Sequence, residues 1–113
     1  MGDSGRDAAL AAAAALLAAA DGADPGAVRR RLERAGGPVA AFDDHLAHLG
    51  RKEEAGEEAA FQALHPVKGD AGAAAALMEA VMAAGGDALT PAQADAARRV
   101  CETLNLSPTR YGL

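Results

Sequence analysis

Residues 16–25 read Leu-Leu-Ala-Ala-Ala-Asp-Gly-Ala-Asp-Pro, and residues 81–91 read Val-Met-Ala-Ala-Gly-Gly-Asp-Ala-Leu-Thr-Pro. In each stretch an apolar run ends at an aspartate, and a capping residue followed by proline comes shortly afterwards. Glycine is favoured just after a helix, and proline is favoured at the first position of the next one. Both stretches therefore predict a helix–turn–helix unit, which the chain carries once near each end.

The composition of the whole chain also favours helices. Alanine, the best helix former, supplies 33 of the 113 residues, whereas aromatic residues make up 3% and isoleucine and tryptophan do not occur. Strands, which are enriched in β-branched and aromatic residues, are therefore not expected. We predict an all-α fold: a single domain over residues 1–113, forming one compact bundle of six or seven helices with a pseudo-twofold repeat of the helix–Asp turn–Pro–helix unit.

Apolar spacing and capping residues predict where the helices lie. Three of the expected helices have a capping residue: about residues 4–20 with Ser4, the helix from Pro25 with Asp24, and the helix from Pro91 with Thr90. Three more are expected at 39–49, around Phe61 and Leu64 up to Pro66, and through 74–82. A short helical turn is expected after Ser107-Pro108. Residues 1–7 are expected to be a flexible N-terminus, and the charged stretch 50–58 a partly frayed connection.

Charge excludes several classes of protein. A net charge of −5 and a pI near 5.0 disfavour nucleic acid as a partner, because phosphates require a basic face. The basic cluster Arg29-Arg30-Arg31 with Arg34 is expected to be a solvated helix face.

The single cysteine, Cys101, fits a reducing compartment. The apolar run 8–20 follows an acidic leader and is too short to span a bilayer. We expect a cytoplasmic protein without a transmembrane segment.

The motifs of the chain resemble the tellurite-resistance TerB family. The similarity is carried by Leu-Thr-Pro-Ala-Gln at 89–93, by Leu-Asn-Leu-Ser-Pro at 104–108, and by the Asp21-Gly22 turn followed by Asp24-Pro25. It extends from about Ala8 to Leu113, with Lys-Gly-Asp at 68–70 in the centre. The resemblance implies an all-helical bundle and a non-enzymatic role in tellurite and other chemical stress. It also implies divalent cations and membrane-associated tellurite-resistance proteins as partners.

A cation site would be formed by Asp21 and Asp87 where the two turns meet. Family members place acids after each proline, whereas this chain has Gly26-Ala27 and Ala92-Gln93 there. Calcium takes six to eight oxygen ligands, so two aspartates aided by carbonyls and water would hold calcium or manganese weakly, with a dissociation constant of about 10⁻³ M. The alternative is that both aspartates only close tight turns through local hydrogen bonds.

Further acidic residues suggest a partner-binding acidic face, listed here as Asp43, Asp44, Glu53, Glu54, Glu57 and Glu58. Asp44 and His48 lie four residues apart, a spacing that suits two metal ligands or an exposed Asp–His pair. Charge runs are also typical of solvated surfaces, so both interpretations stay open.

The expected function is a non-enzymatic TerB-like module that binds a protein partner, and a divalent cation, through its acidic face. The alternative is a degenerate adaptor that has lost cation binding and contacts another protein through apolar and alanine-rich grooves. Cys101 is expected in the core rather than as a nucleophile, and no enzyme motif can be identified. We expect a monomer or a homodimer, located in the cytoplasm or peripherally at the inner face of the membrane.

Overall fold

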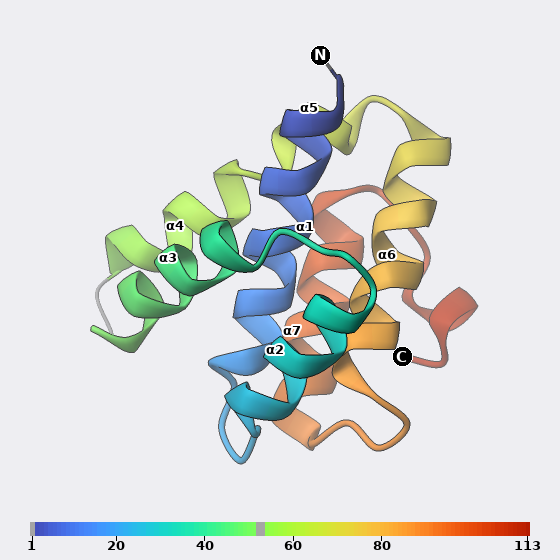
Figure 1. Ribbon diagram of the computed structural model, residues 1–113. Coiled ribbons are helices and arrows are strands. Elements are labelled where there is room, and N and C mark those ends of the chain that lie inside the picture. Colours follow the sequence, from blue (N-terminus) through green and yellow to red (C-terminus); the bar gives the residue numbers. More distant parts are fainter. Residues whose placement is uncertain (1, 52–53) are drawn as a thin grey trace.

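The computed structural model describes residues 2–51 and 54–113, without the side chains of residues 2–4 and 54. Within these ranges the chain is helical, with no strand (Figure 1). The elements are α1 (Gly2–Ala18), α2 (Pro25–Arg34), α3 (Val39–Gly50), α4 (Glu54–Gln62), the single turn α5 (His65–Lys68), α6 (Ala71–Gly85), α7 (Pro91–Thr103) and the 3-10 turn η1 (Pro108–Tyr111). The predicted all-α bundle of six or seven helices is confirmed.

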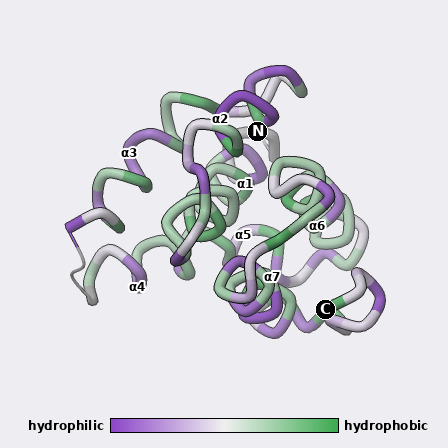
Figure 2. Tube along the Cα trace, turned by 90° about the horizontal axis from the view of Figure 1, so that it is seen from below, coloured by the Kyte–Doolittle hydropathy of each residue, from purple (hydrophilic) through white to green (hydrophobic). Residues whose placement is uncertain are grey.

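Helix α1 is the centre of the bundle, and each of the other six α-helices packs against it. Its residues 11–18 are all buried, and six of these eight are alanines. A helix that is apolar on all sides belongs inside a protein, and the small alanine side chains let its neighbours approach closely. Figure 2 shows this apolar core helix surrounded by helices with hydrophilic outer segments.

Two clusters of larger side chains pack on opposite sides of α1. One is built on Leu17, Leu64, Met78, Val81 and Val100. The other gathers Val28, Leu32 and Phe42 around alanines of α1. Because each cluster takes residues from α1, this helix joins the two into one core.

The predicted caps of the two repeat units are confirmed. The side chain of Asp24 accepts a hydrogen bond from the amide of Ala27 at 3.2 Å and begins α2. Thr90 and Gln93 form a capping box at the start of α7, with backbone-to-side-chain distances of 3.1 and 3.0 Å. Helix α1 ends at Ala18, two residues before its predicted end, so Gly22 lies within the turn and does not close the helix. Its φ of +77° is the left-handed conformation that favours glycine.

Three further boundaries differ from the sequence-based expectation. Helix α1 begins at Gly2, so residues 2–7, expected to be flexible, are helical here, and Ser4 lies inside the helix rather than capping it. Helix α4 begins at Glu54, within the stretch expected to be frayed. Repulsion between like charges one turn apart costs only about 0.2–0.5 kcal/mol per pair, which the burial of Ala60 and Leu64 outweighs. Helix α4 ends at Gln62, and Pro66 is the second residue of the separate turn α5 instead of marking the end of a helix.

None of the helices in the described part of the chain combines the length and the apolar character needed to cross a bilayer.

Candidate functional site

The two predicted turns lie against each other. The hydroxyl of Thr90 donates a hydrogen bond to the backbone carbonyl oxygen of Asp21 at 3.2 Å. A Cβ added to Gly22 would lie 3.5 Å from Cγ2 of Thr90, which is ordinary van der Waals contact. The first and second repeat units are therefore joined at their turns, as expected, but through a backbone carbonyl and not through the two carboxylates.

The carboxylates of Asp21 and Asp87 face different pockets. Asp87 lines a pocket of about 410 Å³ together with Gly22, Asp24 and Arg31. Asp21 lines a separate pocket of about 570 Å³. Among the described residues, no three His, Cys, Asp or Glu side chains are grouped so that they could hold a metal ion. The structure thus brings the two turns together without bringing the two predicted ligands into one pocket.

A positively charged side chain of the protein lies in the pocket of Asp87. Arg31 of α2 directs Nη1 toward the carbonyl oxygens of Ala84 and Gly85, at 3.4 and 3.3 Å. These carbonyls end α6, where the helix dipole is negative, so the guanidinium stabilises the end of the helix. Arg31 was expected on a solvated helix face, and it is exposed. It lies three residues after the buried Val28, so helical spacing places it beside the buried face of α2, whereas Arg30 lies on the opposite side.

The residues of the predicted acidic face are spread over α3 and α4. Asp43 accepts two hydrogen bonds from Arg29 of α2, from Nε at 2.9 Å and from Nη2 at 3.0 Å, and this contact lowers the pKa of Asp43. Glu57 is paired with Arg99 of α7. Asp44 and Glu58 are exposed. Glu53 lies outside the described residues, as does the side chain of Glu54.

The pair Asp44 and His48 is not joined by an ion pair in the described part of the chain, although both residues are exposed on α3. His45 next to them is half-buried. Burial lowers the pKa of His45, the neighbouring His48 lowers it further, and Asp44 partly opposes both effects.

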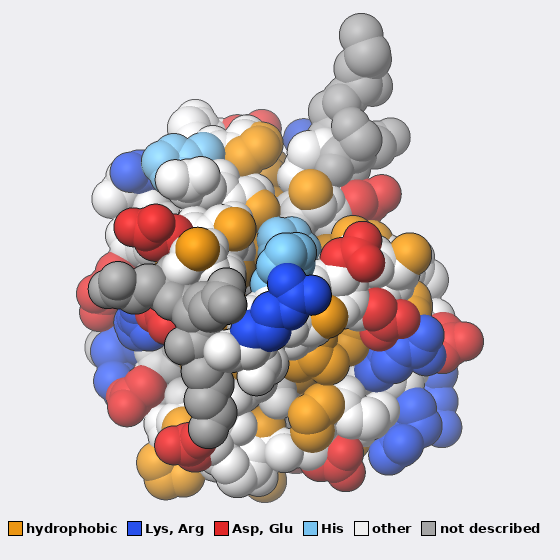
Figure 3. Space-filling model, turned by 90° about the vertical axis from the view of Figure 1, so that its left-hand side faces the viewer, with side chains coloured by type: hydrophobic (Ala, Val, Ile, Leu, Met, Phe, Trp, Pro, Cys, Tyr) orange, Lys and Arg blue, Asp and Glu red, His pale blue; other side chains and the backbone are white. Residues whose placement is uncertain are grey.

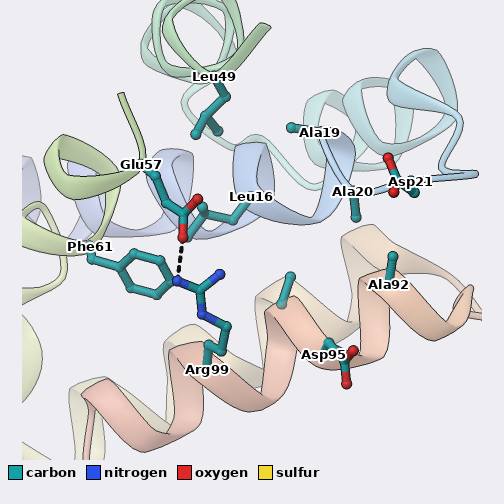
Figure 4. A pocket seen from close by; sticks show the side chains of 11 residues that line it. Leu16, Ala19, Ala20, Asp21, Leu49, Glu57, Phe61, Ala92, Asp95 and Arg99 are labelled. Atoms are coloured by element: carbon teal, nitrogen blue, oxygen red, sulfur yellow. Dashed lines mark hydrogen bonds and ion pairs between the residues drawn. The ribbon is translucent and has the colours of Figure 1, made fainter. Parts of the chain in front are cut away.

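A groove on the surface lies between α4 and α7, and we call it the α4–α7 groove (Figure 4). It has a volume of about 570 Å³. Leu16 of α1, Leu49 of α3 and Phe61 of α4 supply its large apolar side chains, and the alanines 19, 20, 92 and 96 supply most of the remaining wall. The charged lining residues are Asp21, Glu57, Asp95 and Arg99.

Arg99 crosses the groove from α7 to α4. Its guanidinium carbon lies 4.7 Å from the centre of the Phe61 ring, a cation–π geometry, and its Nη2 pairs with the carboxylate of Glu57. Two smaller adjoining pockets, of about 340 and 430 Å³, are also lined by both Phe61 and Arg99. The side chain of Arg99 therefore lines the groove and both adjoining pockets.

Sequence reasoning anticipated apolar, alanine-rich grooves in the adaptor alternative but did not locate this one. Phe61 was only placed on a helix with Leu64, and Arg99 was not singled out. The one local signal was Phe61 itself, a large aromatic side chain in a chain that has only two phenylalanines. Its half-exposed position depends on how far α4 lies from α7, which periodicity does not determine.

Cys101 is completely buried, as expected from its position on α7. Burial raises the pKa of its thiol, and the adjacent Glu102 raises it further, so the reactive thiolate is disfavoured.

Comparison of the chain with known protein families, curated proteins and solved structures finds no significant match.

Proposed function

We propose that this chain is a non-enzymatic module that binds a protein partner through the α4–α7 groove. The observation that carries the proposal is the open apolar groove itself, in which the partly exposed Leu49 and Phe61 lie beside the buried Leu16. A formed apolar depression with a few charged groups at its border is typical of a binding site. Figure 3 shows hydrophobic side chains gathered on the face that carries α3 and α4, with charged side chains around them.

The lining of the groove supports binding rather than catalysis. It contains no Ser, Thr, Cys, Lys or His in the described part of the chain. Its carboxylates are partly engaged, since Glu57 pairs with Arg99 and Asp95 pairs with Arg98 at 2.6 Å. A nucleophile next to a base, the arrangement required for covalent catalysis, is not among these residues.

The resemblance to the TerB family extends the proposal to the cell. It suggests a cytoplasmic module in the response to tellurite or other chemical stress, with membrane-associated tellurite-resistance proteins as partners. The proposal has two forms: an adaptor that binds protein without metal, and a module that also binds a divalent cation. We favour the adaptor. Asp21 and Asp87 line separate pockets, and the positive charge of Arg31 lies in the pocket of Asp87, where it opposes a second cation.

An NMR titration distinguishes the two forms. We expect no saturable ¹⁵N–¹H shifts at residues 21–22 and 87–88 when calcium, manganese or zinc is added at millimolar concentration. Saturable shifts there that disappear in an Asp21→Ala/Asp87→Ala variant would restore the cation-binding module.

Peptide display tests the binding function. The immobilised protein is used to select binders from a random peptide library, and each selected peptide is measured against two variants. Ala96 lines the groove on α7, whereas Ala94 on the same helix does not, so Ala96→Gln and Ala94→Gln form a matched pair. We expect Ala96→Gln alone to weaken binding. If the selection yields no peptide that is sensitive to Ala96→Gln in the folded protein, the proposed function fails.

A further inference from the structure

We propose that the partner segment recognised by the α4–α7 groove is a short amphipathic helix whose apolar face is flanked by lysine or arginine. This inference rests on the proposed function, because it names the chemistry of the segment that the same groove would take.

The shape of the groove favours a helix. It is open to solvent and runs between α4 and α7, with Leu16 of α1 at its base (Figure 4). Residues 2–51 and 54–113 contain no strand, so they offer no sheet edge to which an extended peptide could add. A groove between two helices is the usual site for a third, which inserts its apolar face. The half-buried Ala92 and Ala96 on the α7 wall leave room for the backbone of such a helix to approach.

The charge at the border of the groove selects a basic partner. Four carboxylates, those of Asp21, Glu57, Glu58 and Asp95, line the groove or the adjoining 430 Å³ pocket. Arg99 is the one Lys or Arg among the described lining residues of both. Asp21 and Glu58 are exposed and take part in no ion pair with the described residues, so they remain available to the lysines of a partner.

A second copy of this chain is a poorer occupant of the groove. A symmetric dimer places the same surface of each subunit against the other, so the acidic border of one groove would face the acidic border of the second. Like charges brought together across an interface disfavour association, whereas a basic helix is complementary to them.

Arg99 competes with the partner for the same carboxylate. It is paired with Glu57 and lies over Phe61, so it occupies the position that a lysine of the bound helix would take. The side chain of Arg99 is 56% exposed and can rotate toward solvent without leaving a buried charge unpaired. Its displacement would join the groove to the adjoining pocket and uncover the face of Phe61.

The experiment uses synthetic peptides of about four helical turns with leucines at helical spacing. One peptide carries lysines beside the leucines, a second has glutamates in their place, and a third has the lysine composition in scrambled order. Binding to the full chain is measured by fluorescence anisotropy at low and high salt. We expect the lysine peptide to bind at least about tenfold more tightly than either other peptide, with the advantage over the glutamate peptide decreasing as salt screens the charges.

Charge-reversal variants locate the effect. Asp21→Lys/Glu58→Lys should weaken the lysine peptide and strengthen the glutamate peptide. Asp7→Lys/Glu79→Lys changes the net charge by the same amount at exposed positions that line neither the groove nor its adjoining pockets, and should leave the preference unchanged. Arg99→Gln should tighten binding of the lysine peptide several-fold, whereas Arg34→Gln on α2 should not.

Each outcome bears on a stated part of the proposal. Equal binding of the lysine and glutamate peptides, or an equal effect of both double variants, overturns the basic partner but leaves the proposed function standing. Equal binding of the scrambled peptide overturns the helix. A dimer that dissociates on Ala96→Gln, detected by sedimentation velocity, would replace the partner by a second copy. If none of these peptides binds and the library selection also yields no binder, the proposed function is overturned as well.

Discussion

The guanidinium of Arg31 lies directly against Gly86, the residue that follows α6. A Cβ at Gly86 would be 2.7 Å from Cζ of Arg31, and Nη1 of Arg31 donates to the carbonyl of the preceding residue, Gly85, at 3.3 Å. Helix α2 belongs to the first repeat unit and α6 to the second. The two units are therefore held together by a contact between a cation and a helix end that neither unit contains by itself.

Removing the charge of Arg31 should destabilise the fold. We expect Arg31→Met to lower the free energy of unfolding by about 1 kcal/mol, because the last carbonyls of α6 lose a charged donor while most of the apolar stem is retained. Urea unfolding measures the effect. Arg30→Met on the same helix is the control and should change stability by less than half as much. Equal losses in the two variants would contradict the stabilising contact between Arg31 and the end of α6.

The glycine at position 86 should be coupled to Arg31. Gly86 has φ +84° and ψ −176°, a conformation almost confined to glycine, so Gly86→Ala should cost about 1–3 kcal/mol in unfolding free energy. Part of that cost comes from contact with the guanidinium and should be relieved in Arg31→Met. A double-mutant cycle should give a coupling of at least about 0.5 kcal/mol, and strict additivity would show that the contact carries no energy.

Thr90 should contribute more to stability than an ordinary helix cap. Its hydroxyl accepts from the amide of Gln93 at 3.1 Å and donates to the carbonyl of Asp21 at 3.2 Å. We expect Thr90→Ala to lower the free energy of unfolding by about 1–2 kcal/mol. Thermal unfolding measures both variants, and Thr90→Ser, which keeps the hydroxyl, should lose less than half as much unfolding free energy as Thr90→Ala. A serine variant as unstable as the alanine variant would mean that the methyl group, and not the hydroxyl, is responsible.

Gly56 should set the distance between α3 and α4. A Cβ at this position would lie 2.7 Å from the backbone carbonyl oxygen of His48, so α4 must move if the residue becomes alanine. Because α4 carries Glu57 and Phe61, we expect Gly56→Ala both to lower the melting temperature and to weaken binding of the lysine peptide. Gly50 at the end of α3 has open space around it, and Gly50→Ala should leave the melting temperature unchanged or raise it. Similar effects of the two substitutions would contradict this role of Gly56.

Acidification should destabilise the protein partly through His45. Burial lowers the pKa of His45 in the folded state, so the unfolded chain binds the proton more readily. The favourable contribution of the neutral imidazole is complete above the unfolded pKa of about 6.5 and is lost as the pH falls through the folded value. Urea unfolding between about pH 7.5 and 5 should therefore show a smaller loss for His45→Gln than for the unchanged protein. An NMR titration that finds His45 at or above the ordinary pKa would contradict this prediction.

Local features of the sequence predicted the elements well. Asp24-Pro25 and Thr90-Pro91 begin helices where expected, because caps and prolines act on the first turn of their own helix. The start of α4 at Glu54 was not predicted, since its charged sequence argues for a frayed segment and its burial depends on contact with α1 and α3. The start of α1 at Gly2 was missed for a related reason, because it lies before the apolar run that marks the helix.

The class of fold, the repeated turns and the alanine-rich helix could be predicted from the chain alone, since each depends on residues within a few turns of one another. The packing of the helices was needed to show that Asp21 and Asp87 line different pockets, that Arg31 lies at the end of α6, and that Phe61 and Arg99 meet across a groove. These relationships join residues that are 38 to 66 positions apart in the chain. They depend on the distances and angles at which helices pack around α1, and no local pattern specifies those quantities.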